Sequence, residues 1–301
     1  MTQPRQYLPG STYMLTRRVV GRHYLLRPDE LVSQIYLYCL ATMSEKHGIA
    51  VHGFTLMSSH AHLTVTDTRG EMGAFLRDFH RLVANAMKLV RDWDGILWDG
   101  SEPSVVRLET PHAFVQQAAY LIANPVSGGA VPRSKQWPGL IVHADELGRK
   151  CWTVKRPDLY FDAESWPKTA TLKLKMPEDL GMTDAQVREA VAEEAERLEQ
   201  EARDAMRAKG RSFMGVEKVL SVSPQKRATT PEPHAKRNPT FAVGRHQPEA
   251  YRAAVEALRA FRTAYRDALH QWRQGLRSVQ FPAGTYLMRW LHHVDVAPAP
   301  G

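Results

Sequence analysis

The first 145 residues alternate between short apolar runs and longer amphipathic runs. Runs rich in β-branched and aromatic residues, typical of strands, cover residues 12–20, 49–57, 61–67 and 104–109. Apolar residues recur at helical spacing over residues 31–46, 71–93 and 112–125. The order β-α-β-β-α-β-α predicts an α+β, ferredoxin-like split βαβ fold, an antiparallel sheet with helices on one face.

Turn and capping residues separate these runs. Pro28 and Asp29 precede the first predicted helix and Gly48 follows it. The pair Ser58-Ser59 is short enough to join its two strands as a hairpin. Pro125 is expected to end the third helix, because proline disfavours helical backbone in the residue before it.

The pattern changes after about residue 150. Thr183 can cap a helix, with Gln186 reaching back, and the apolar period ends at Lys209-Gly210. Residues 223–240 are rich in Pro, Ser, Thr and basic residues and are typical of a loop. A second long helix is expected from about Pro248 to Leu276. Its predicted buried stripe consists of Tyr251, Val255, Leu258, Phe261, Tyr265, Leu269, Trp272 and Leu276.

Length and pattern together predict two units. A chain of 301 residues can form one large domain or two globular units, and the change of pattern after residue 150 favours two. We therefore predict a catalytic domain over residues 1–150 and a basic, mainly helical C-terminal extension over 151–301, with a linker at about 223–246.

Composition narrows the class of protein. The chain is 43% apolar, which excludes a disordered protein, and its two cysteines are too few for a disulfide framework. No run of eighteen apolar residues occurs and the first ten residues lack an apolar core, so neither a membrane span nor a signal peptide is expected. These features predict a reduced, cytoplasmic protein.

Basic charge is concentrated late in the chain. Residues 1–150 hold 16 Lys and Arg against 13 Asp and Glu, a net charge of +3. Residues 211–280 hold 13 against 5, a net charge of +8. This placement suits contact between a separate segment and a polyanion.

Two pairs of residues could carry chemistry. His60 and His62 are two apart on a predicted strand, so both imidazoles point to one face and can converge on a cation. Tyr120 and Asn124 are one helical turn apart and share a face. Taken separately, each pair has a structural alternative: two packed or surface histidines, and a core tyrosine with an asparagine helix cap.

Together the two pairs resemble the HUH-type single-tyrosine transposases, specifically the REP-associated tyrosine transposases of the IS200-like group. The matching residues span 10–145, about half of the chain. They are the segments Tyr13–Arg17, His52–Leu63 and Tyr120–Val126. The chain departs from the family at Ser58-Ser59, where Pro-Asn is usual, at Ala61, where a bulkier residue is usual, and at Ser127-Gly128-Gly129, where Arg-Ala-Gly is usual. None of these departures removes a catalytic group.

The resemblance implies a mechanism. His60, His62 and the side-chain oxygen of Asn124 would hold one divalent ion, Mg²⁺ or Mn²⁺, and Tyr120 would be the nucleophile. The protein would cut and rejoin single-stranded DNA beside a hairpin or imperfect palindromic repeat, through a 5′-phosphotyrosine link. It would act as a monomer or a homodimer.

Arginines could bind the DNA backbone at two places. Arg17, Arg18 and Arg22 follow the first strand and could clamp phosphates, although a solvated loop explains them equally well. On the late helix a basic stripe faces away from the apolar one, and it could bind DNA or simply face solvent. It consists of Arg252, Arg259, Arg262, Arg266, Arg273 and Arg277. Lys226, Arg227, Lys236 and Arg237 in the linker could contribute in the same way.

Other functions fit the sequence less well. A domesticated protein that binds repeat hairpins without cleavage is the main alternative, but it has no chemical reason to keep His60, His62, Tyr120 and Asn124. A replication initiator or relaxase generally has a different motif order or an attached helicase, and no Walker-type glycine-rich loop occurs. A zinc hydrolase is disfavoured because no helical His-Glu-x-x-His motif is present.

Overall fold

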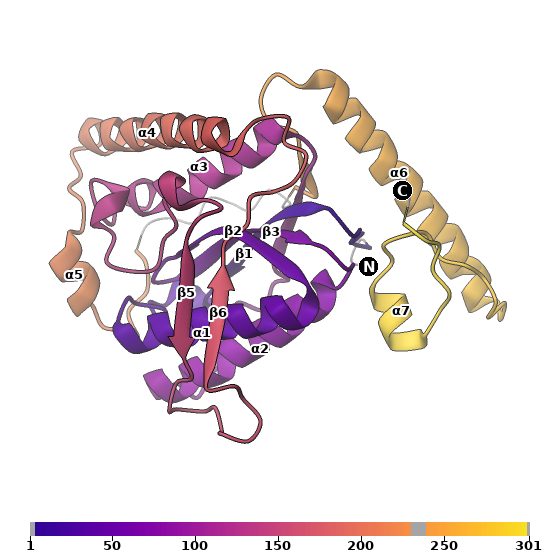
Figure 1. Ribbon diagram of the computed structural model, residues 1–301, viewed down its shortest axis with the longest axis horizontal. Helices are drawn as coiled ribbons and strands as arrows, with labels where there is room; N and C mark the ends of the chain where they lie inside the picture. The colour runs from indigo at the N-terminus through magenta and orange to yellow at the C-terminus, as the bar shows by residue number, and fades with distance from the viewer. Residues whose placement is uncertain (1–3, 230–238, 300–301) are drawn as a thin grey trace.

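A five-stranded sheet forms the centre of the N-terminal half (Figure 1). The computed structural model describes residues 4–229 and 239–299. The strand order is β2-β3-β1-β4-β7, and all neighbours are antiparallel except β4 and β7. The strands are β1 (Thr12–Arg18), β2 (Ile49–Leu56), β3 (His60–Asp67), β4 (Ser104–Leu108) and β7 (Phe241–Ala242). The predicted α+β, ferredoxin-like class is confirmed.

The hairpin of β2 and β3 forms as the sequence predicts. Ser58 and Ser59 make its turn, and the Met57 amide donates to the His60 carbonyl at 2.9 Å. Apolar side chains such as Leu63 and Val65 point into the core, because alternate residues of a strand face opposite sides. The strand begins one residue earlier than predicted and therefore includes His60.

Two helices, α1 (Glu30–His47) and α2 (Met72–Arg91), pack together and cover one face of the sheet (Figure 1). Asp29 caps α1 by accepting from the Val32 amide, and Gly48 ends it with a left-handed φ of 65°. At the start of α2, the buried Asp67 carboxylate accepts the backbone N–H groups of Arg69, Glu71 and Met72. Both predicted helices are confirmed within two residues at each end.

The third helix, α3 (Pro111–Ser127), crosses the opposite face of the sheet, and α4 (Asp184–Ala208) packs on it (Figure 1). The expectation that the helices share one face therefore holds for α1 and α2 but not for α3. The expected end of α3 at Pro125 is also wrong, because the helix continues to Ser127. Pro125 has no N–H to donate to the Leu121 carbonyl, and the Thr55 hydroxyl of β2 donates to that carbonyl instead, at 2.8 Å. This bond fastens the end of α3 to the sheet.

A hairpin that the sequence did not predict covers the outer side of α1. Its strands are β5 (Cys151–Lys155) and β6 (Thr169–Lys173), and they pair antiparallel. Val154 and Leu172 of this hairpin, with Val187 and Val191 of α4, belong to the same buried core as the main sheet. One apolar core thus crosses residue 150, and a domain boundary there stays a prediction.

The predicted capping of α4 is confirmed. The Thr183 hydroxyl accepts from the Gln186 backbone amide, and the Gln186 side chain accepts from the Thr183 backbone amide. The helix ends at Ala208, and Lys209 is its C-cap. Short helical turns, η1 (Val20–Arg22), η2 (Ser134–Gln136) and η3 (Ala144–Glu146), connect the larger elements. Cys39 is buried, Cys151 is exposed, and both are free thiols.

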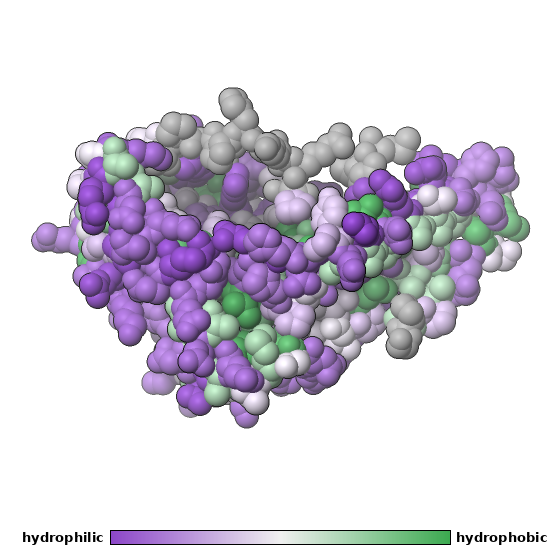
Figure 2. Space-filling model, turned by 90° about the horizontal axis from the view of Figure 1, so that it is seen from above, coloured by the Kyte–Doolittle hydropathy of each residue, from purple (hydrophilic) through white to green (hydrophobic). Residues whose placement is uncertain are grey.

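The C-terminal part contains α5 (Val216–Ser221), α6 (Pro248–Arg273) and α7 (Leu287–His292). Near the end of α6, Ala268 packs with Phe281, Met288 and Val294 in a small separate core. We call α6, α7 and the segments around them, residues 248–299, the C-terminal unit. Hydrophobic side chains reach the surface among hydrophilic ones at the end where this unit lies (Figure 2).

Two expectations for the C-terminal half need correction. Of the predicted buried stripe on α6 only Phe261 is buried, while Tyr251 and Leu276 are 54% and 50% exposed, because few elements pack against this helix. The expected linker at 223–246 is partly ordered structure, since Phe241 and Ala242 form β7 and extend the sheet. Lys236 and Arg237 lie outside the described residues. No described helix is long and apolar enough to cross a membrane.

Candidate active site

His60, His62 and Asn124 meet where the end of α3 lies over the start of β3. Asn124 Oδ1 accepts from His60 Nε2 at 3.0 Å, and Asn124 Nδ2 donates to His62 Nε2 at 3.2 Å. The two imidazole rings are 4.8 Å apart between centroids. The structure therefore brings together all three side chains that the sequence assigned to a metal site.

Two hydroxyl groups hold the outer nitrogens of these rings. The amide orientation leaves His62 Nε2 as an acceptor, so His62 Nδ1 donates to Thr16 Oγ1 at 2.8 Å. Ser59 Oγ donates to His60 Nδ1 at 3.2 Å. Thr16 lies directly opposite His62 in the pairing of β1 with β3. Sequence reasoning missed Thr16 and Ser59, although Thr16 could have been found from the alternation of β1.

Burial keeps both histidines neutral. Desolvation lowers the pKa of His60 from 6.5 to about 4, and a hydrogen bond to Asn124 only partly opposes this shift. Desolvation also lowers the pKa of His62 well below its ordinary value, with the nearby His60 and Arg18 adding to the effect. Neutral imidazole is the form that binds metal ions.

The donor set fits a divalent ion with open coordination positions. Two neutral imidazoles from β3 and one amide oxygen from α3 converge on the same point. The hydrogen bond to Thr16 fixes the orientation of the His62 ring, as hydrogen bonds to metal-binding histidines commonly do. Within residues 4–229 and 239–299, no group of three or more His, Cys, Asp or Glu side chains could hold a metal ion. The Asn124 amide oxygen is the third donor of the cluster formed by His60 and His62.

Tyr120 stands at the open side of this cluster. Its ring lies 5.3 Å from the His62 ring and edge-on to it, and its side chain is 40% exposed. Desolvation raises the pKa of Tyr120 above 10.0, while Asn124 and the positive charge of Arg18 oppose the rise. The phenol is thus the cluster's accessible reactive group, and the two imidazoles lie behind it.

The predicted arginine clamp is divided by the sheet. The charges of Arg18 and Arg22 act on His60, and that of Arg18 also acts on His62 and Tyr120, so both arginines lie near the cluster. Arg17 points to the opposite face, where its guanidinium donates to the Ser101 carbonyl and lies over the Trp98 ring. Alternation along β1 causes the separation, and Arg17 therefore does not join Arg18 at this site.

A segment after α5 holds the loop that carries Arg22. Ala228 donates to the Arg22 carbonyl, and the Tyr24 amide donates to the Lys226 carbonyl. Arg227 Nε donates to His23 Nε2 at 2.8 Å. Arg22 itself has a left-handed φ of 57°, a conformation that an ordinary side chain adopts only when its surroundings impose it. The Lys226 carbonyl and the Arg227 side chain thus brace this loop, and the binding of DNA by these two linker residues stays a prediction.

The arginines of the late helix lie on the C-terminal unit. Arg262 is half-buried and the other five are exposed. Those five are Arg252, Arg259, Arg266, Arg273 and Arg277. They form the predicted solvent-facing basic stripe, and their binding of DNA stays a prediction.

Two solved structures are similar to part of this chain. One is a REP-associated tyrosine transposase bound to a REP hairpin, with 18% identity, a TM-score of 0.39, and coverage of 46% of this chain and 81% of its own. The other is a candidate transposase from Deinococcus radiodurans R1, with 20% identity, a TM-score of 0.28, and coverage of 35% of this chain and 85% of its own. Both are transposases. No family model and no curated protein matches the chain.

Proposed function

We propose that this protein is a metal-dependent, site-specific endonuclease and strand transferase for single-stranded DNA, acting beside DNA hairpins through a 5′-phosphotyrosine intermediate. The observation that carries the proposal is the convergence of four side chains from β3 and α3. His60, His62 and Asn124 form one hydrogen-bonded cluster, and Tyr120 stands beside it, accessible to a large substrate.

The reaction proposed for Tyr120 conserves the phosphodiester bond energy. The phenolic oxygen attacks phosphorus and forms a new ester to the 5′-phosphate, while the bond to the leaving 3′-oxygen breaks and that oxygen takes up a proton. A free 3′-hydroxyl can later reverse the step, which rejoins DNA without ATP. The phenol must lose its proton on attack, and the positive charge of Arg18 favours the ionised form.

A divalent ion, Mg²⁺ or Mn²⁺, bound by His60, His62 and Asn124 would polarise the scissile phosphate and stabilise the charge that develops on it. To bind it, His60 must present an unprotonated Nε2, so its proton moves to Nδ1, where Ser59 Oγ lies at 3.2 Å and can accept. His62 needs no such change, because Thr16 already holds its proton at Nδ1. The cluster is therefore one tautomeric step away from an ion-binding arrangement.

Arg18 and Arg22 are suited to hold the substrate. Both lie near the cluster, and guanidinium groups bind phosphate oxygens in a bidentate manner. Single-stranded DNA bends more freely than a duplex, so its scissile phosphate can approach Tyr120 while neighbouring phosphates contact these arginines. We propose that DNA with a hairpin or palindromic repeat is the partner.

The test begins with a search of the DNA that flanks the gene for palindromic repeats, and each repeat found is used as a hairpin substrate in a cleavage assay. The oligonucleotide carries a fluorophore at its 3′ end, because the fragment with the 5′-phosphate is the one that would stay attached. We expect a fluorescent protein band in a denaturing gel with Mn²⁺ or Mg²⁺, and none with EDTA. Tyr120→Phe should abolish the band and leave hairpin binding within about twofold.

The matched control is Tyr160→Phe, which changes a tyrosine that is also exposed, at 41%, and lies in the loop between β5 and β6. This variant should form the adduct normally. Normal cleavage by Tyr120→Phe would show that the nucleophile is wrongly assigned. Tight hairpin binding by the unmodified protein without any adduct, with or without Mn²⁺, would favour the non-catalytic alternative.

A further inference from the structure

A cavity lies on the side of the sheet opposite Tyr120, between α2 and the C-terminal unit. Its volume is about 460 Å³, within the range of about 300–1,000 Å³ that is typical of small-molecule sites. Six segments of the chain, spread from Pro4 to Leu287, line it. The residues that matter here are Arg5, Tyr7, Arg17, Arg77, Tyr265 and Tyr286.

Three guanidinium groups face this cavity, and they differ in how they are neutralised. Arg5 pairs with Glu102 at 3.0 Å, and Arg77 pairs with Asp78 at 2.9 Å. Arg17 forms no ion pair with any described residue, and its Nε is buried without a hydrogen-bond partner there. Its terminal nitrogen Nη1 donates to the Ser101 carbonyl, and the nearby charge of Asp99 acts on the guanidinium. Arg17 is thus the guanidinium of this cavity without a paired carboxylate among the described residues, which suits contact with an anionic ligand.

Tyrosines form the other walls of the cavity. Tyr7 and Tyr286 meet edge to face with centroids 6.0 Å apart, and Tyr286 stacks on Trp290. Arg77 fixes this arrangement by donating to the Tyr286 hydroxyl at 3.2 Å while lying over the Trp290 ring. Fixed aromatic rings next to guanidinium groups are the combination on which a nucleobase and its phosphate bind.

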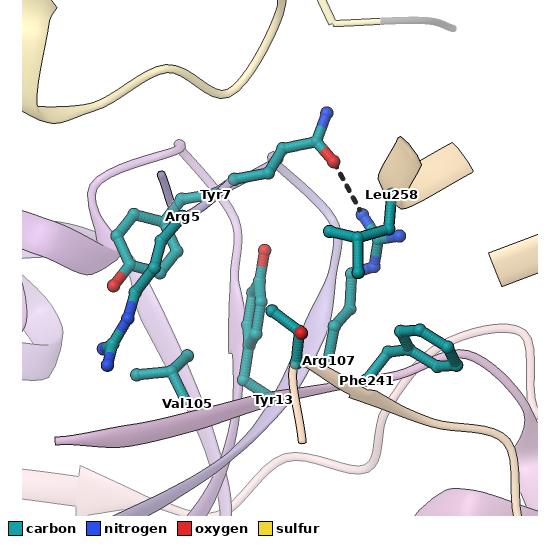
Figure 3. A pocket seen from close by; sticks show the side chains of 9 residues that line it. Arg5, Tyr7, Tyr13, Val105, Arg107, Phe241 and Leu258 are labelled. Atoms are coloured by element: carbon teal, nitrogen blue, oxygen red, sulfur yellow. Dashed lines mark hydrogen bonds between the residues drawn. The ribbon is translucent and has the colours of Figure 1, made fainter. Parts of the chain in front are cut away.

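The walls are held in place by close backbone contacts. Gly73 of α2 lies flat against the Tyr286 ring, since a Cβ built at this position would come within 2.3 Å of Tyr286 Cε1. The Tyr7 amide donates to the Gly284 carbonyl at 3.0 Å, which ties the N-terminal segment to the C-terminal unit. Figure 3 shows Arg5 and Tyr7 beside Tyr13 in a smaller neighbouring cavity, so these two side chains form a wall shared by both cavities.

We propose that this cavity binds a nucleoside monophosphate unit. The phosphate would contact Arg17 and Arg5, and the base would pack against Tyr7 and Tyr286. The unit could be a free nucleotide or one nucleotide of a single-stranded DNA. Single-stranded DNA can reach both the cavity and the active site. Arg17 and Arg18 are adjacent on β1 and point to opposite faces, so a DNA strand that crosses this end of the sheet can contact both. The inference does not rest on the cleavage reaction.

The experiment measures binding to the full chain carrying Tyr120→Phe, so that cleavage plays no part. The probes are dAMP, deoxyadenosine, inorganic phosphate and a fluorescent single-stranded dT15, titrated at one fixed salt concentration. The variants are Arg17→Gln and Arg5→Gln. Arg207→Gln is the matched control, because it removes one positive charge from an exposed position on α4. Thermal melting of each variant shows that it is folded.

We expect dAMP to bind at least tenfold more tightly than deoxyadenosine or phosphate. Arg17→Gln should weaken dAMP binding at least tenfold, and Arg207→Gln should change it less than twofold. A parallel loss of dT15 binding identifies DNA as the source, whereas loss of dAMP binding alone identifies a free nucleotide. Equal binding of phosphate and dAMP, or unchanged dAMP binding by folded Arg17→Gln and Arg5→Gln, would overturn the proposal.

Discussion

Asn124 Oδ1 lies 3.0 Å from His60 Nε2, although the two residues are 64 positions apart in the sequence. The same amide group also reaches His62, so one side chain of α3 closes the site that two residues of β3 begin. Because the amide offers one oxygen and one N–H₂ group, it can serve one imidazole as acceptor and the other as donor. A cation bound at this site would replace these hydrogen bonds and would be coordinated by Asn124 Oδ1.

Asn124 should therefore control the response to metal. Asn124→Ala removes an oxygen ligand, and we expect the Mn²⁺ concentration for half-maximal adduct formation to rise at least about tenfold. Asn85→Ala, an exposed amide on α2, is the control and should leave that concentration unchanged. An unchanged requirement for Mn²⁺ in Asn124→Ala would mean that the amide is not a ligand.

The basic stripe on α6 should contribute to DNA affinity through phosphates alone. Arg259→Gln combined with Arg266→Gln should weaken hairpin binding regardless of sequence, and should lower the slope of log affinity against log salt by about 1–2. The double variant Arg207→Gln with Arg211→Gln removes equal charge from the last turn of α4 and the residues that follow it, and should not change the slope. Equal slopes in the unmodified protein and both double variants would mean that the basic stripe faces solvent and does not contact DNA.

Buried histidines outside the active site should make the fold sensitive to acid. His52 is 1% exposed, and desolvation lowers its pKa from 6.5 to about 4. Because the folded state binds this proton less readily than the unfolded chain, stability is complete above pH 6.5 and is lost as pH falls toward 4. The expected loss is about 3 kcal/mol for this residue.

Urea unfolding between pH 7 and pH 4 measures this effect. The variant His52→Gln keeps polar atoms but does not titrate, so its free energy of unfolding should fall less steeply over the same interval. The same slope in His52→Gln and in the unmodified protein would assign the acid sensitivity to other groups, of which buried His80, with a pKa of about 3, is the next to substitute.

The contact between Gly73 and Tyr286 should hold the C-terminal unit against α2. Gly73→Ala places a methyl group into the Tyr286 ring, and we expect a loss of about 1–3 kcal/mol in unfolding free energy and faster proteolysis after residue 240. In a Tyr286→Ala background the same substitution should be neutral or stabilising, because alanine favours a helix more than glycine does. A loss of equal size in both backgrounds would contradict the proposed contact.

Local sequence patterns were enough to predict much of the N-terminal half. The period-two runs, the cap at Asp29 and the left-handed Gly48 depend on neighbouring residues only, and the structure has strands and a helix end where these predict them. The same locality explains why His60 and His62 share a face, as do Tyr120 and Asn124. Strand alternation and helical spacing fix those pairs before any tertiary contact forms.

Contacts between distant segments decided the features that the sequence analysis missed. Helix α3 passes through Pro125 because Thr55, 66 residues from Leu121, takes over the freed carbonyl. In the hairpin β5–β6, Ala170, Leu172 and Leu174 alternate with polar residues, a local strand signal that the sequence analysis overlooked, and packing on α1 buries these apolar side chains. The predicted apolar stripe of α6 is covered only in part: Tyr251 and Leu276 at its two ends are exposed, and the helical period alone cannot reveal how much of a stripe finds a partner.

The sequence by itself determined which residue types this protein presents on each strand and helix, because backbone periodicity is a local property. Only the tertiary structure decided which of those faces meet. It placed the Asn124 amide between two imidazoles from another element, and it gave Arg17 and Arg18, which strand alternation already sets on opposite faces, different neighbours: the cavity beside α2 for Arg17 and the histidine cluster for Arg18. Those distances depend on the packing of whole elements, and packing sums contacts over the entire chain.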